Sequence, residues 1–72
     1  MKLKLQKFSP IDREYSIIEI IDEGNDVLLD VSRNDDGLLE VCFHPSVSNR
    51  VLPYDELMAS IEQARVRALA DD

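Results

Sequence analysis

The sequence predicts an α+β fold, in which a three- or four-stranded antiparallel β-meander carries one C-terminal helix on one face. Two observations favour it. The first two thirds of the 72 residues contain short segments that alternate apolar and polar side chains, with turn residues between them. The last third repeats apolar residues at three- and four-residue spacing, which is typical of a helix with one buried side. A chain this short builds one small core, so we expect a single domain over residues 1–72.

The expected strands cover about residues 2–8, 15–22, 27–33 and 38–44. The first, KLKLQKF, carries lysines that suit the edge of a sheet, and without it the meander has three strands. The second, YSIIEIID, is rich in the β-branched residues that favour strands.

Side-chain parity predicts the turn in NDDG, because a slip of one residue moves a whole strand to the wrong face. A three-residue loop over residues 35–37 sets Val31 opposite Val41, so both join the core face. Gly37 then takes the left-handed position of a type I turn with a bulge, where glycine costs least.

The same argument predicts the turn in EGND. A two-residue loop over residues 24–25 sets Ile20 opposite Leu29, whereas the alternative register puts Glu19 in the core. Gly24 in the first loop position is the type II′ pattern.

The residues after the last strand predict a loop and then a helix over about residues 53–70. Asp55 and Glu56 in its first turn complement the helix dipole. Its apolar stripe is enough to cover one face of a small sheet, and consists of Leu57, Met58, Ile61, Ala64, Ala68 and Leu69.

The face of the sheet turned away from this helix is mixed, and its cover is the open question. Acidic side chains are expected to line up across three strands between apolar ones, the set being Glu19, Asp30 and Glu40 with Ile17, Ile21 and Leu28. Three covers fit the pattern. The first strand or the loop 45–52 folds over this face, a second copy of the chain buries it, or a foreign partner binds there.

Charge and composition narrow the class of protein. The net charge is −7, and between Glu14 and Glu40 Arg33 is the one basic residue among nine acids. Such a field repels nucleic acid and anionic membranes and attracts basic partners. One cysteine allows no internal disulfide, and no export signal or long apolar run is visible, so we expect a cytoplasmic protein that does not bind membranes.

Motifs for chemistry are sparse. Cys42 and His44 lie two positions apart on one strand, roughly 6–7 Å, which is too far for a nucleophile and its base. Two such ligands are also too few for zinc. NDDG fails as a calcium loop, because Ser32 and Phe43 would fill its first and last ligand positions. We therefore expect no catalytic residue, no metal site and no cofactor.

The hairpin VLLDVSRNDDGLLEVCF and the ending PYDELMASIEQARVRAL resemble, in general pattern, small acidic bacterial immunity proteins of toxin–immunity pairs. The resemblance implies a cytoplasmic protein that binds a basic nuclease or similar toxin through acidic side chains, and it assigns no individual residue.

The expected function is non-catalytic protein binding that occludes a basic partner, through Glu19, Asp30, Glu40, Ile17, Ile21 and Leu28. The alternative is a structural homodimer that buries its second sheet face between the two copies.

Overall fold

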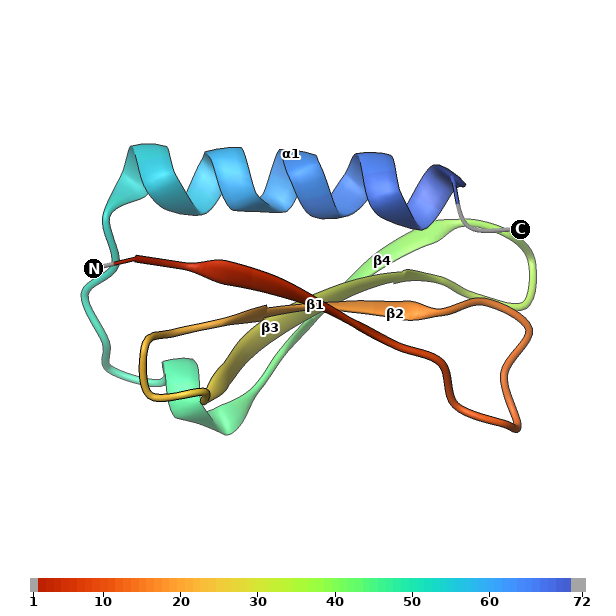
Figure 1. Ribbon diagram of the computed structural model, residues 1–72, viewed down its shortest axis with the longest axis horizontal. Helices are drawn as coiled ribbons and strands as arrows, with labels where there is room; N and C mark the ends of the chain where they lie inside the picture. The colour runs from red at the N-terminus through yellow and green to blue at the C-terminus, as the bar shows by residue number, and fades with distance from the viewer. Residues whose placement is uncertain (1, 71–72) are drawn as a thin grey trace.

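The computed structural model describes residues 2–70 and confirms the predicted α+β fold (Figure 1). The sheet has four strands, and each pairs in antiparallel fashion with the next along the chain, in the order β1-β2-β3-β4. The elements are β1 (Lys4–Phe8), β2 (Ile17–Ile21), β3 (Val27–Arg33), β4 (Leu39–Phe43), the short 3₁₀ helix η1 (Pro45–Val47) and α1 (Tyr54–Ala70). The N-terminal segment is thus an edge strand beside β2.

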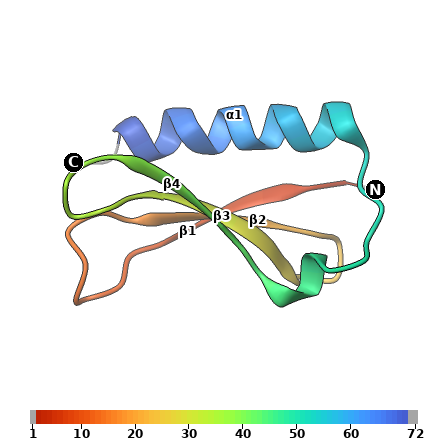
Figure 2. The ribbon, with the colours of Figure 1, turned by 180° about the vertical axis from the view of Figure 1, so that it is seen from behind.

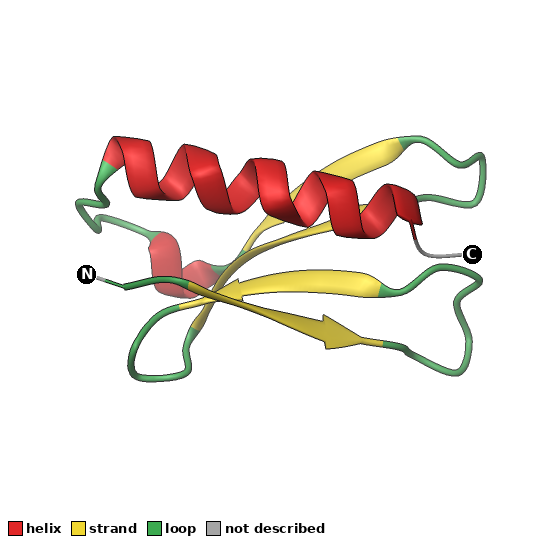
Figure 3. Ribbon diagram, turned by 45° about the horizontal axis from the view of Figure 1, so that its top comes forward, coloured by secondary structure: helices red, strands yellow, loops and turns green. Residues whose placement is uncertain are grey.

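α1 lies along one face of the sheet (Figures 1 and 3), and the core lies between the two. Small residues at four-residue spacing, Ser60, Ala64 and Ala68, form the buried line of the helix. Because these side chains are short, the helix can lie close to the strands. Opposite them the sheet contributes the buried residues Ile18, Ile20, Leu29 and Val31. Four partly buried side chains pack against this core: Leu3 and Leu5 from the N-terminal segment, and Leu57 and Ile61 from the helix.

One helix is too narrow for this sheet. A helix with its side chains is about 10–12 Å across, whereas four strands spaced about 4.8 Å apart span about 14 Å between the axes of the outer two. α1 packs mainly on β2 and β3, with a smaller contribution from β1. Along residues 2–70, no helix is both long enough and apolar enough to cross a membrane.

The turn between β3 and β4 confirms the prediction for NDDG. Val31 pairs with Val41, and Gly37 has a φ of 83°. The Asn34 side chain closes the loop, because its Oδ1 accepts hydrogen bonds from the backbone N–H groups of Asp36 at 2.9 Å and Leu38 at 3.1 Å. The expected core register of this hairpin therefore holds.

The turn between β2 and β3 has the predicted pairing of Ile20 with Leu29 but a different loop. The type II′ prediction is wrong, because Asn25, and not Gly24, takes the positive φ, at 67°. Asp22 donates its N–H to the Asp26 carbonyl at 3.0 Å, which makes a three-residue loop. Asparagine tolerates the left-handed region better than most residues. Asn25 can therefore take the same place in this loop that Gly37 takes in the loop between β3 and β4.

A three-residue loop alone would have shifted the strands by one residue. The structure compensates with a β-bulge: Ile21 pairs with Val27, Ile20 pairs with Leu29, and Leu28 is the extra residue. The predicted core pairs therefore survive because the bulge offsets the longer loop.

Candidate functional site

The free edge of the sheet at β4 exposes a row of apolar side chains. We call Leu39, Val41 and Phe43 the β4 column. They are 37%, 46% and 66% exposed, respectively. Phe43 lies opposite Leu29 and Val41 opposite Val31, so these two side chains face the same side of the sheet as the buried core. Figure 2, with β4 nearest the viewer, shows no segment of the described chain over this edge.

The helix adds apolar side chains next to the β4 column. Glu56 and Arg67 mark the flank of α1 that faces β1, because Glu56 binds the Leu3 backbone and Arg67 lines a depression together with Lys7. At 100° per residue, Tyr54, Met58 and Leu69 lie on the other flank, toward β4. All three are exposed. Met58 and Leu69 were expected in the buried stripe and instead border its open side.

The opposite face of the sheet is partly covered by the chain itself. After β4 the segment 44–52 folds under the sheet, where η1 lies on the side away from α1 (Figure 1). His44 donates its N–H to the Leu28 carbonyl at 2.9 Å, and the Ser46 hydroxyl donates to the Val27 carbonyl. Ile21 and Leu28 are buried. Of the three possible covers for this face, internal cover by loop 45–52 applies at the end that holds Ile21 and Leu28.

An ion pair holds this covering segment in place. The Arg50 guanidinium donates to Asp22 Oδ2 at 2.7 Å, and Asp22 Oδ1 accepts the backbone N–H groups of Gly24 at 2.8 Å and Asp26 at 3.0 Å. The hydrogen bond from Arg50, reinforced by these N–H groups, lowers the pKa of the Asp22 carboxyl below its usual range. The β2–β3 turn and the chain that follows β4 are therefore fastened together.

The loop that joins β1 to β2 reaches the other end of this face. Arg13 donates from Nη2 to the Ser32 hydroxyl at 3.4 Å and to the Arg33 carbonyl at 3.3 Å. The Arg33 guanidinium in turn stacks over the Tyr15 ring, 4.1 Å from its centre. Between these two ends, the face opposite α1 is polar, because Glu19, Asp30 and Cys42 lie across it on neighbouring strands.

The predicted acidic line forms only in part. Glu19 lies opposite Asp30, as expected, and accepts a hydrogen bond from Gln6 Nε2 at 2.8 Å. Glu40, however, lies opposite Ser32, and Cys42 takes the position facing Asp30. Among the expected apolar anchors, Ile17 is half-buried and pairs with Phe8 and Ser32. Since Ile21 and Leu28 are buried, they are not open to a partner in this conformation.

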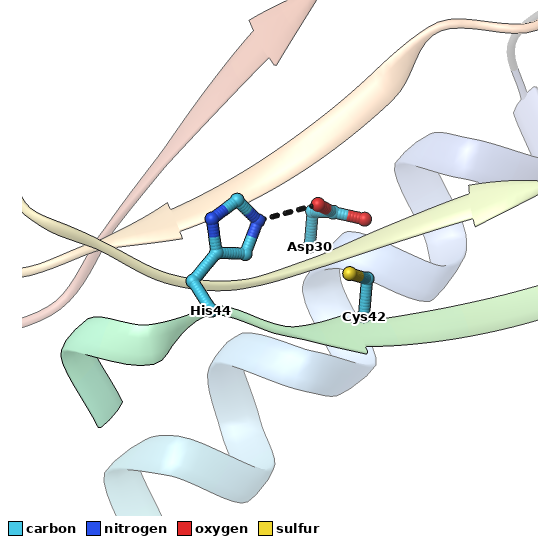
Figure 4. Close-up of side chains that lie close together, drawn as sticks. All are labelled: Asp30, Cys42 and His44. Carbon is cyan, nitrogen blue, oxygen red and sulfur yellow. Dashed lines mark hydrogen bonds and ion pairs between the residues drawn. The ribbon is translucent and has the colours of Figure 1, made fainter. Parts of the chain in front are cut away.

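A cluster that the sequence did not predict forms at the centre of this polar face. One ligand atom from each of Asp30, Cys42 and His44 lies within 4.8 Å of the other two, and Asp30 Oδ2 is 2.7 Å from His44 Nε2. The ligand atoms of Cys42 and His44 thus lie closer together than the spacing of roughly 6–7 Å between their positions on one strand. In Figure 4 the ring nitrogen not bonded to Asp30 points away from Cys42, so the cluster lacks the sulfur–imidazole contact of a nucleophilic cysteine.

Comparisons of the chain with protein-family models, with curated proteins and with solved structures find no match.

Proposed function

We propose that this protein is a non-catalytic binding module that accepts an extended segment of a partner protein as a fifth strand beside β4. The β4 column carries the proposal, because three apolar side chains lie exposed on a free sheet edge. An edge strand presents unpaired backbone N–H and C=O groups that a further strand can bind, and the side chains on alternate positions then give specificity.

The chemistry of β4 defines the segment that fits. On the helix side, the β4 column and its neighbours Tyr54 and Met58 favour apolar side chains. On the other side, β4 presents Glu40, and Asp30 and Glu19 follow on the next two strands. A strand that alternates apolar residues with lysine or arginine would cover the first set and pair with Glu40, while Asp30 and Glu19 add to the negative field behind it. The net charge of −7 would speed the encounter with such a basic partner.

A role of the immunity type is consistent with this surface. In that role the module acts in the cytoplasm and occludes the active surface of a basic protein. The support is the combination of an acidic chain, a free edge and apolar side chains beside it. Of the expected acidic contacts, Glu40 on β4 is kept, whereas Asp30 and Glu19 lie on β3 and β2, farther from an added strand. The apolar anchors move from Ile21 and Leu28 to the β4 column.

A homodimer through β4 is the second candidate. Pairing of two β4 strands around a two-fold axis at Val41 sets Leu39 of one copy opposite Phe43 of the other, and Glu40 opposite Cys42. No like charges face each other in that register, which favours it. The charge of −7 on each copy opposes it.

The test uses Val41→Lys with Val66→Lys as its matched control, because Val66 is an exposed valine on α1. Fluorescence anisotropy measures binding of a short synthetic peptide that alternates valine and lysine. A second peptide has the same composition with its lysines grouped. We expect the alternating peptide to bind more tightly, and Val41→Lys to weaken it about tenfold or more, equal to about 1.4 kcal/mol. Val66→Lys leaves the affinity unchanged.

Two results contradict the proposal. Equal affinity for both peptides would mean that charge alone attracts them, with no added strand. A dimer in sedimentation equilibrium that Val41→Lys converts to a monomer would assign β4 to the second copy.

A further inference from the structure

The cluster of Asp30, Cys42 and His44 joins three kinds of metal-binding group at one point of the sheet. Asp30 and Cys42 are cross-strand partners on β3 and β4, and His44 follows Cys42 by two residues. Figure 4 shows all three side chains on the same side of these strands. The antiparallel register therefore brings together residues from two separate segments of the chain.

The distances between the donors suit a zinc ion after small side-chain rotations. Zinc binds sulfur at about 2.3 Å and nitrogen or oxygen at about 2.0–2.2 Å, so tetrahedral donors lie about 3.3–3.7 Å apart. The cluster brackets this range, because its closest donors, Asp30 Oδ2 and His44 Nε2, are 2.7 Å apart and all three lie within 4.8 Å. Rotation about side-chain bonds changes such distances without moving the strands.

The chemistry of the three donors selects the ion. Thiolate and imidazole bind zinc and other late transition metals, whereas calcium and magnesium prefer oxygen ligands alone. A carboxylate completes a set of three, which leaves a fourth tetrahedral position open. Asp30 and Cys42 also line a surface depression together with Glu40, so solvent and ions can reach these two donors.

We infer that Asp30, Cys42 and His44 form a site for one Zn²⁺ ion on the face of the sheet opposite α1. The site lies on the face of the sheet opposite the β4 column, and zinc binding is tested without a partner strand. Glu19 lies opposite Asp30 and adds negative charge nearby without belonging to the three donors. In this structure Asp30 and His44 bond to each other and Cys42 is a free, exposed thiol.

The test is a titration of the full-length, reduced protein with Zn²⁺ by calorimetry, and with Co²⁺ by absorption spectroscopy. We expect one ion per chain and the absorption band of a sulfur–cobalt bond. Cys42→Ser should abolish that band and weaken Zn²⁺ binding about tenfold or more, and His44→Ala should weaken binding similarly. Glu62→Gln is the matched control, since it changes an exposed carboxylate on α1, on the other side of the sheet from the cluster, and it should bind zinc as the original chain does.

A second measurement follows the thiol directly. Bound Zn²⁺ should slow the alkylation of Cys42 by N-ethylmaleimide in the original chain and in Glu62→Gln, and less so in His44→Ala. Because Cys42 is exposed, Cys42→Ser is expected to keep the circular dichroism spectrum of the fold. Zinc binding of equal strength in Cys42→Ser would show adventitious binding by surface carboxylates and overturn the inference. No binding to the original chain, or alkylation unaffected by zinc, would overturn it as well.

Discussion

The two edges of the sheet are closed to different degrees. At the β1 edge, the backbone N–H of Leu3 donates to Glu56 of α1 at 2.6 Å, and Leu5 packs against the helix-side core. At the β4 edge, Val41 and Phe43 face the same side as that core and remain exposed. Strand composition alone does not explain the difference, because β4 is the more apolar of the two. The position of one narrow helix over β1, β2 and β3 decides which edge stays open.

The strongest test of this contrast compares two residues that face each other across β3 and β4. Leu29 is buried and Phe43 is 66% exposed. We expect Leu29→Ala to lower the free energy of unfolding by about 2–5 kcal/mol through a lost core contact and a cavity, and Phe43→Ala to lower it by less than about 1 kcal/mol. Urea unfolding measures both. A cost for Phe43→Ala as large as that for Leu29→Ala would mean that another surface covers β4 in solution.

A second test loosens the closed edge. Glu56→Ala removes the acceptor of the Leu3 N–H, and a hydrogen bond to a charged group contributes about 1.5–3 kcal/mol when well formed. We expect a loss toward the lower end of that range, with faster amide exchange at Leu3. Glu62→Ala is the control, because it removes an exposed carboxylate that pairs with Arg65 three residues away on α1. If both variants exchange at Leu3 as the original chain does, Glu56 does not fasten β1.

The third and smallest effect concerns the chain that follows β4. Asp22→Asn keeps an oxygen for the turn N–H groups but removes the charge that pairs with Arg50. Since the pKa of Asp22 is lowered in the folded state, its ionised form stabilises the fold above the pKa of an unfolded aspartate. That stabilisation is lost as the pH falls through the folded pKa.

Thermal unfolding of both chains from neutral to acidic pH measures this effect. The original chain should be the more stable at neutral pH, and the difference should shrink as the pH falls. A difference that stays constant with pH would show that the Asp22–Arg50 pair does not stabilise the fold through its charge.

The strand register was predictable from the sequence, because burying Ile20, Leu29 and Val31 on one face admits few alternatives. The conformation of the first turn was not. Gly24 and Asn25 can both adopt a positive φ, and the choice depends on Asp22, whose side chain bonds inside the loop. The bulge at Leu28 follows from that choice, and alternation of side chains does not reveal it.

The site residues were harder to predict for a different reason. Along a single strand, the two-residue spacing of Cys42 and His44 predicts side chains too far apart for direct contact. The predicted pairing of Val31 with Val41 already implies that Asp30 faces Cys42, and this was the signal that could have located the cluster. The exposure of the β4 column could not be foreseen in the same way, because it depends on where the helix lies across the sheet.

The open edge at β4 also has a consequence for the protein at high concentration. Uncovered apolar strands are the units from which separate molecules stack into fibres. The net charge of −7 opposes such stacking, since each copy repels the next. Salt shortens the reach of that repulsion from about 10 Å at 0.1 M to about 3 Å at 1 M. Ionic strength therefore governs the colloidal stability of this chain, and concentrated salt removes the protection that its acidity provides against aggregation.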